Sequence, residues 1–139
     1  MTDSSIVMTI AVLGGTGKEG KGLAYRWAKA GYHVHIGSRE AAKALSAATE
    51  VMGLLEGEAF VDGMTNLEAA QQADIVVLTV PYAAHASTLE SVKDALNGKI
   101  LVDVTVPLVP PKVTTVQMPK AGSAAQEAKE ILGADAQVC

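Results

Sequence analysis

The sequence predicts an α/β protein built on a doubly wound parallel sheet, and three observations support this fold class. Short apolar runs rich in β-branched residues alternate with longer segments whose apolar residues recur every three or four positions. Glycine or proline closes most of the apolar runs. The 139 residues amount to about one domain, and the 49% hydrophobic content comes mostly from small aliphatic side chains. We therefore expect a single domain over residues 1–139 with right-handed crossovers, in which residues 1–7 form a disordered or variable N-terminal extension.

Five segments are predicted to be strands, with the beginning of a sixth at the end of the chain. Each is rich in aliphatic residues and too short for a buried helix, and the fourth is the nearly unbroken apolar run of a strand buried on both faces. Prolines at 81 and 107 stop the fourth and fifth strands, and a loop with prolines at 110, 111 and 119 follows. The predicted strands cover residues 9–13, 32–36, 58–61, 74–80, 99–106 and 137–139.

Helices are predicted between these strands because apolar residues recur at spacings of three and four. The first helix runs from Gly17 to Ala30, and Gly31 follows as its terminator. Two later helices open with the capping-box patterns Thr65-x-x-Glu68 and Ser123-x-x-Gln126. The predicted buried faces are Leu23, Trp27 and Ala30 in the first helix, Ala41, Leu45, Ala48 and Met52 in the second, and His85, Leu89, Val92 and Leu96 after the fourth strand.

Charge and composition exclude several classes of function. The net charge is −4, and the few basic residues gather near the first glycine-rich loop, so no basic surface for nucleic acid is expected. The apolar start lacks the cationic leader and the length of a signal or membrane segment, and Cys139 is the only cysteine. His33 and His35 share a strand face without further residues at ligand spacing, so no metal is expected. A cytoplasmic protein without nucleic-acid or membrane partners is the expectation.

The segment GGTGKEG, residues 14–20, lies directly after the first strand and opens the first helix. Within it, Gly15, Gly17 and Gly20 have the spacing of a dinucleotide-binding loop, in which they permit a tight turn, close approach of a pyrophosphate and close helix packing. The free N–H groups and the positive dipole end of the helix would face the anion. The strand–helix–strand context favours this reading over a glycine-rich turn without ligand, and the position of Lys18 excludes a P-loop. A Rossmann-type sheet of order 3-2-1-4-5 with an incipient sixth strand is predicted.

The end of the second strand favours NADP over NAD as the dinucleotide. NAD sites usually carry an acidic residue there, which accepts hydrogen bonds from the ribose hydroxyls. This chain has Ser38 and Arg39, with Lys43 one helical turn further, and all three suit a 2′-phosphate. Glu40 is the competing feature, although an acidic residue in a first helical turn is more often a partner of the helix dipole.

The roles of the polar residues near the expected ligand crevice are less strongly indicated by the sequence. His85 starts the helix after the fourth strand, where packing or lining the site is favoured over acid–base catalysis, because hydride transfer does not itself need a proton donor. Asp103 and Thr105 share a face of the fifth strand and are expected to satisfy neighbouring backbone groups.

Four segments in the order GGTGKEGKGLA, IGSRE, DIVVLTVPY with His85 shortly after, and VPLVPP resemble the NADPH-dependent coenzyme F420 reductases, also called F420:NADP oxidoreductases. The resemblance covers nearly all of residues 8–139, although ketopantoate reductases and the ferric-reductase domains of membrane metalloreductases share parts of it. It implies direct hydride transfer between the deazaflavin ring of F420 and the nicotinamide of NADP(H).

The resemblance also implies roles for individual residues. Thr16, Gly17, Lys18 and Glu19 would hold the pyrophosphate. Ser38, Arg39 and Lys43 would hold the 2′-phosphate, and Thr79, Val80 and Pro81 would lie on the ribose and nicotinamide side. The predicted cofactor site comprises Gly15, Thr16, Gly17, Lys18, Glu19, Gly20, Ser38, Arg39, Lys43, Thr79, Val80, Pro81 and His85.

Three features depart from the family pattern. The pair Lys18-Glu19 replaces small or apolar residues, and Tyr82 stands where the family has tryptophan. Family members continue from residues 137–139 through a sixth strand, a histidine-containing turn and a C-terminal helical region that help to form the deazaflavin site and a dimer. The expectation is a cofactor-binding fragment or a shortened relative, with the dinucleotide and the deazaflavin as small-molecule partners and a homodimer left open.

Three functions are compatible with these observations. The leading one is an NADP-dependent oxidoreductase of the F420 type, which acts mainly by aligning two rings. The second is a non-catalytic module that binds or senses NADP. The third is an NADPH-dependent reductase of another acceptor, such as a flavin–ferric system or a small keto acid.

Overall fold

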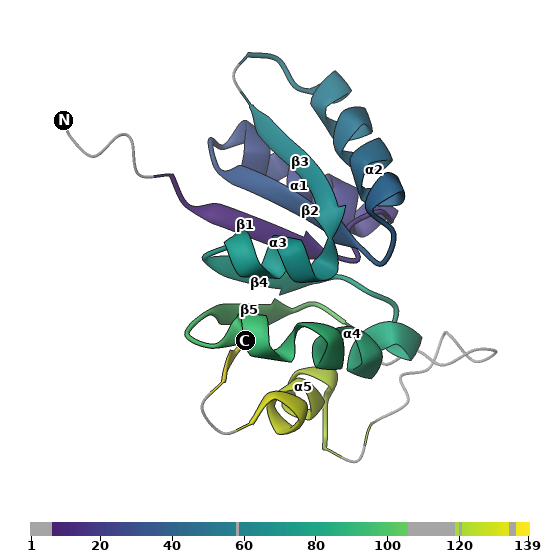
Figure 1. Ribbon diagram of the computed structural model, residues 1–139, viewed down its shortest axis with the longest axis vertical. Helices are drawn as coiled ribbons and strands as arrows, with labels where there is room; N and C mark the ends of the chain where they lie inside the picture. Colours follow the sequence, from purple (N-terminus) through teal and green to yellow (C-terminus); the bar gives the residue numbers. More distant parts are fainter. Residues whose placement is uncertain (1–6, 58, 106–118, 120, 134–135) are drawn as a thin grey trace.

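A wholly parallel six-stranded sheet forms the centre of the structure (Figure 1). The structure, a computed structural model, describes residues 7–57, 59–105, 119, 121–133 and 136–139. The strand order β3-β2-β1-β4-β5-β6 confirms the predicted order and the sixth strand. The strands are β1 (Thr9–Leu13), β2 (His33–Ser38), β3 (Phe60–Thr65), β4 (Ile75–Leu78), β5 (Ile100–Asp103) and β6 (Gln137–Val138).

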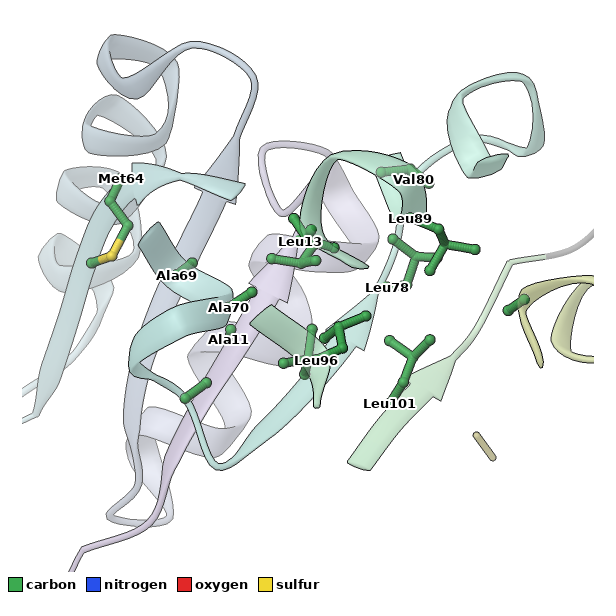
Figure 2. Packing of buried hydrophobic residues seen from close by; sticks show 14 residues of the cluster. Ala11, Leu13, Met64, Ala69, Ala70, Leu78, Val80, Leu89, Leu96 and Leu101 are labelled. Carbon is green, nitrogen blue, oxygen red and sulfur yellow. The ribbon is translucent and has the colours of Figure 1, made fainter. Parts of the chain in front are cut away.

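Helices cover both faces of the sheet, as a doubly wound fold requires. Alternate residues of β1 point to opposite faces, so that Ile10 and Val12 pack with α1 and α2, whereas Ala11 and Leu13 pack with α3 and α4 (Figure 2). Both layers are apolar and rich in alanine and valine, as the composition predicts. The helical elements are α1 (Lys18–Lys29), α2 (Ala41–Leu54), α3 (Asn66–Gln72), η2 (Tyr82–Ala84), α4 (His85–Val92), η3 (Lys93–Leu96) and α5 (Ala124–Leu132).

The register of the sheet brings the carboxyl ends of four strands into one row. Leu13 at the end of β1 lies beside Gly37 of β2 and Leu78 of β4, and Leu78 lies beside Asp103 of β5. The segments that leave these strands therefore emerge at a common edge, which is where doubly wound sheets bind their ligands.

Several predicted strand boundaries are wrong, and the second strand ends at Ser38 instead of at residue 36. The third strand begins and ends later than predicted, because β3 follows the β2 ladder from Phe60 to Thr65 even though Asp62 and Gly63 interrupt its apolar pattern. The fourth strand stops at Leu78, where the chain turns toward the glycine loop, and the ladder of the fifth ends at Asp103. The predicted end of the fifth strand at residue 106 and the prolines at 107, 110 and 111 lie outside the described residues, as do residues 1–6.

The predicted buried faces of the first two helices are displaced by about one position. Gly20, Ala24 and Ala28 are the buried residues of α1, while Leu23 and Trp27 are only partly buried and Ala30 is exposed. The side chains nearest the sheet are small because the helix comes close to the strands. The larger apolar residues flank the contact instead of forming it.

The second helix shows the same displacement. Ala44, Ala47, Ala48 and Val51 are buried, so Ala48 alone of the predicted face is confirmed as buried, and Leu45 and Met52 are exposed. The approach of α2 to β3 is so close that a Cβ at Gly63 would lie 2.2 Å from the carbonyl oxygen of Ala44. By contrast, the predicted face of the helix after the fourth strand is confirmed, with all four of its residues buried.

Both predicted helix caps are present. Thr65 and Glu68 form a reciprocal capping box at the start of α3. Ser123 Oγ accepts a hydrogen bond of 3.1 Å from the backbone N–H of Gln126 at the start of α5. Within the described part of the chain, no helix combines the length and the apolarity that crossing a bilayer requires.

Candidate functional site

The glycine-rich loop after β1 is held by close backbone packing. A Cβ at Gly20 would lie 2.5 Å from the Cα of Gly15, so the start of α1 can touch the loop only because residue 20 is glycine. A Cβ at Gly15 would lie 2.8 Å from the carbonyl oxygen of Val12, so this glycine is required by the strand beneath it. Gly14 has a φ of +68°, and a Cβ there would lie 2.3 Å from Cγ1 of Val80. The amide of Gly15 donates to the carbonyl of Gly37 at 3.1 Å. The loop is thereby fixed to both β2 and the segment that follows β4.

Gly17 differs from these glycines because nothing in the protein requires the absence of its side chain. It is exposed and precedes α1 in an extended conformation, and an added Cβ would meet no atom within 4 Å. As N-cap, it has no side chain that could accept hydrogen bonds from the first amides of the helix. The N-terminus of α1 therefore presents open space and backbone donors, which is what an approaching anion needs.

A cavity of ≈ 480 Å³ lies between this loop and the ends of β4 and β5. The glycine loop forms one wall, and the residues that follow the two strands form the other. The predicted pyrophosphate residues and the predicted ribose–nicotinamide residues thus face one space. The lining comprises Gly14, Thr16, Gly17, Lys18, Glu19, Gly20, Thr79, Val80, Pro81, Tyr82, Val104 and Thr105.

Two side-chain hydrogen bonds tie the walls of the cavity to the sheet and to α3. The hydroxyl of Thr79 donates to the carbonyl of Leu13 at 2.9 Å and keeps its lone pairs for an incoming donor. The buried Asn66 of α3 accepts from the amide of Gly14 at 3.2 Å through Oδ1. Sequence reasoning missed Asn66, because an asparagine in the first turn of a helix gives no signal of a contact with a loop 52 residues earlier.

The predicted 2′-phosphate residues lie at the end of β2 and directly beyond it, at the same edge of the sheet. Ser38 is buried, and its hydroxyl accepts from the amide of Glu40 at 3.3 Å. Arg39 is exposed. Lys43 Nζ lies 2.8 Å from Glu40 Oε2, and this hydrogen bond and the lysine charge lower the pKa of Glu40. Glu40 therefore pairs with Lys43, and since both side chains are exposed, water competes with the pair.

A chain of polar side chains lies beside the cavity, behind Tyr82. His85 is fully buried and does not line the cavity. Its Nε2 lies 2.7 Å from Asp103 Oδ2 and its Nδ1 3.2 Å from Glu127 Oε1. Tyr82 does line the cavity, and its hydroxyl donates to Glu127 Oε2 at 3.0 Å. We call these four residues the Tyr82–Asp103 network.

Burial and hydrogen bonding within this network shift the pKa values of His85, Asp103 and Tyr82. Burial alone would lower the pKa of His85, but the hydrogen bonds and negative charges of Asp103 and Glu127 raise it above 6.5. Burial would likewise raise the pKa of Asp103, but hydrogen bonds from His85 and from the backbone N–H of Thr105 hold it below 3.8. Burial and the hydrogen bond to Glu127 raise the pKa of Tyr82, so its phenol stays protonated as a donor.

The expectation for Asp103 is confirmed in part. It accepts from the backbone N–H of Thr105 at 2.9 Å, but its other oxygen pairs with His85, which the sequence did not indicate. The hydroxyl of Thr105 is buried at the cavity and has no hydrogen-bond partner among the described residues, so the expectation that it satisfies a neighbouring backbone group is wrong for this part of the chain. Such an unpaired buried hydroxyl costs about 1–3 kcal/mol unless a ligand completes it.

The two histidines of β2 lie away from this site. His33 stacks on Phe60 with ring centroids 4.6 Å apart, and burial lowers the pKa of His35. Among the described residues, no group of three or more histidine, cysteine, aspartate or glutamate side chains is arranged to hold a metal ion. The absence of a metal stays a prediction.

Known proteins similar to this chain share both its sequence pattern and its fold. The model of the family described as "NADP oxidoreductase coenzyme F420-dependent" matches residues 9–107. The F420-dependent NADP reductase of Methanothermobacter marburgensis is 55% identical over 102 residues, which are 73% of this chain and 46% of that protein. The enzyme of the same name from Methanocaldococcus jannaschii is 40% identical over 131 residues, 90% of this chain and 58% of that protein. The chain thus spans about half the length of these relatives.

A solved structure extends the similarity to three dimensions. The crystal structure of a putative F420-dependent NADP-reductase from Arthrobacter sp. FB24 matches with a TM-score of 0.76 and 29% identity. The match covers 94% of this chain and 60% of that one. The sheet and the helices described above therefore correspond to part of a longer known structure.

Proposed function

We propose that this chain, which belongs to the family of coenzyme F420-dependent NADP oxidoreductases, binds NADP(H) at the carboxyl edge of its sheet and takes part in hydride transfer with F420. The observation that carries the proposal is the loop from Gly14 to Gly20. Three of its glycines are required by the packing of the protein itself, whereas the open position of Gly17 leaves a cradle that only a ligand would use.

The residues around the loop suit NADP(H) in charge and shape. The N-terminus of α1 offers backbone N–H groups to the pyrophosphate without a side chain at Gly17 in the way. Arg39 and Lys43 supply positive charge beyond β2, where the adenosine ribose would carry its 2′-phosphate. Thr79 and Thr105 supply hydroxyl groups on the opposite wall.

The contribution of the chain to the reaction is positioning. NADP(H), when bound, supplies the hydride or accepts it. Val80 and Pro81 give one side of the cavity an apolar surface, and the hydroxyl of Thr79 is held in one orientation by the carbonyl of Leu13. A ring fixed between such walls reacts faster because its orientation is already set. No acid–base group is needed at the cavity for this step.

The choice between NADP and NAD is tested by calorimetric titration of the chain with NADPH and NADH. Arg39→Ala should weaken NADPH about 10- to 100-fold, the loss of a charge-assisted hydrogen bond, and leave NADH nearly unchanged. Arg26→Ala removes another exposed arginine, from α1 and away from the cavity lining, and serves as the matched control. Equal weakening of NADPH and NADH by Arg39→Ala would contradict the 2′-phosphate assignment.

The cradle is tested with Gly17→Ala. Because the new methyl group meets no protein atom, the stability of the chain should change by no more than about 1 kcal/mol, the range of N-cap effects. Both NADPH and NADH should nevertheless bind at least tenfold more weakly, because the methyl group occupies the space of the pyrophosphate. Unchanged affinity would place the anion elsewhere.

Hydride transfer itself is tested by adding F420 to the NADPH-loaded chain and following the absorbance.

A further inference from the structure

We propose that Glu127 and His85 are positioning residues that hold the ring of Tyr82 against the cavity and thereby set the affinity for the dinucleotide. The inference rests on the proposed function, since the ligand is the NADP(H) proposed above. It concerns the wall of the cavity that is formed after β4, where Tyr82 follows Pro81.

The position of Tyr82 depends on a partner distant in sequence. Tyr82 belongs to η2, a short 3-10 turn of three residues, which fixes a side chain less firmly than a long helix. Tyr82 lines the cavity, and its hydroxyl is held at 3.0 Å by Glu127 of α5. The orientation of this ring therefore depends on the place of Glu127.

His85 fixes Glu127 in turn. Both nitrogens of the imidazole face carboxylate oxygens, Asp103 on one side and Glu127 on the other. An ionised carboxylate only accepts hydrogen bonds, so when both carboxylates are ionised both nitrogens donate and the ring carries a positive charge. The second oxygen of Asp103 accepts from the amide of Thr105, and the second oxygen of Glu127 accepts from Tyr82. Each member thus has a partner that determines its orientation.

The network joins elements that are far apart along the chain. Asp103 ends β5, His85 begins α4, and Glu127 lies in the first turn of α5, which packs beside α4 (Figure 1). The side chains of His85 and Asp103 are fully buried, so breaking their contact would leave a buried charge unpaired, and the cluster holds the three elements in one arrangement. The wall of the cavity is therefore coupled to the docking of α5.

The same geometry predicts a pH dependence. The titratable groups that face His85 are Asp103 from β5, Glu127 from α5 and Tyr82 from η2, whose ring centroid lies 5.8 Å from that of His85. When His85 loses a proton, one carboxylate loses its donor. The contact of His85 with Glu127 is longer than its contact with Asp103, and the side chain of Glu127 is partly exposed. Glu127 is therefore the carboxylate that loses its hydrogen bond from His85, because water can replace that donor. Tyr82 would then lose its anchor, and dinucleotide affinity would fall.

The experiment measures NADPH binding by fluorescence for the wild type, Glu127→Ala, Tyr82→Phe and the double variant. Each single variant should weaken NADPH about 3- to 10-fold, the loss expected for one hydrogen bond. The double variant should bind no more weakly than Tyr82→Phe, because Glu127 acts through the tyrosine hydroxyl. Glu130→Ala, which removes an exposed carboxylate from the same helix, should bind as the wild type does.

The pH dependence is measured with the same assay. The wild type should bind NADPH more weakly at pH 9 than at pH 6.5, and Glu127→Ala should lose this difference.

Additive losses in the double variant would overturn the proposal, and so would unchanged affinity in Glu127→Ala. A second measurement does not depend on ligand: nitrogen NMR should show His85 doubly protonated at pH 7, and the Tyr82 Cζ signal should shift in Glu127→Ala. A neutral His85, or a Tyr82 signal insensitive to Glu127→Ala, would overturn the positioning network even if the chain binds NADPH. A wild type that binds no NADPH would instead refute the proposed function and, with it, the role in affinity, whatever the NMR result.

Discussion

Replacing Gly20 by alanine should destabilise the protein through one identifiable contact. The new Cβ would lie 2.5 Å from the Cα of Gly15, 2.9 Å from its carbonyl carbon and 3.0 Å from its oxygen. All three atoms belong to the backbone, so no side-chain rotation relieves the overlap and α1 must move away from the loop. Overpacking of this kind costs about 1–3 kcal/mol, and the rigid partner places Gly20→Ala near the upper end.

Gly22→Ala is the matched control for this prediction. Gly22 lies in the same helix, and an added Cβ there meets nothing within 4 Å. Alanine in place of a helical glycine stabilises by about 0.5–1 kcal/mol, and both substitutions gain this term. The difference between the two variants therefore isolates the contact with Gly15, about 2–3 kcal/mol.

The assay is urea unfolding followed by circular dichroism for the wild type and both variants. Gly22→Ala should raise the transition midpoint, and Gly20→Ala should lower it with an unchanged slope, since a change of slope would indicate a change in the surface exposed. In thermal melts the two variants should differ by roughly 10 °C. Equal midpoints for Gly20→Ala and Gly22→Ala would refute the argument that the third glycine of the loop is required by the packing of the helix.

Three further predictions concern the core, a cap and pH. Leu89→Ala should cost about 2–5 kcal/mol in urea unfolding because Leu89 is fully buried, whereas exposed Leu67→Ala should cost less than about 0.5 kcal/mol; similar losses would contradict the assigned core. Thr65→Ala should cost about 1 kcal/mol by the same assay through loss of the capping box, and no loss would show that the cap is redundant. The folded pKa of His85 is raised, so its contribution to stability is full below pH 6.5 and is lost as pH rises through the folded value. The folded pKa of Asp103 is lowered, so its contribution is present above pH 3.8 and is lost as pH falls through the folded value. Unfolding free energies measured from pH 6 to 9 should therefore decline less steeply in His85→Gln, and an identical decline would refute the assignment.

The order of the strands could be predicted from the sequence because each buried strand is a local signal. The segment around Val76 is apolar on both faces, and the glycine loop marks the strand before it as the first of a dinucleotide-binding unit. The limits of β3 could not be predicted in this way. Its last residues pair with Gly37 and Ser38 of β2, and that pairing, more than their own composition, makes them a strand.

The buried faces of α1 and α2 were predicted wrongly for a common reason. Large apolar residues such as Leu45 and Met52 attract attention in a sequence, but a helix that lies close to a sheet places its smallest residues at the contact. Ala44 meets β3 only because Gly63 opposite it has no side chain. A stripe of alanines opposite a strand glycine was the available signal, and it can be recognised only when the two elements are considered as a pair.

His85 shows the difference between predicting a position and predicting its chemistry. The helical spacing predicted its burial correctly, since His85 and Leu89 lie one turn apart on the face of α4 that meets the sheet. On β5, Leu101 and Asp103 are likewise two residues apart and share a face. Leu89 and Leu101 belong to the same apolar cluster (Figure 2), so the layer between helix and sheet changes from apolar to charged within one turn, toward the edge where the cavity lies. Periodicity cannot reveal this change, because it records which residues face the sheet and not which residue of another element faces them.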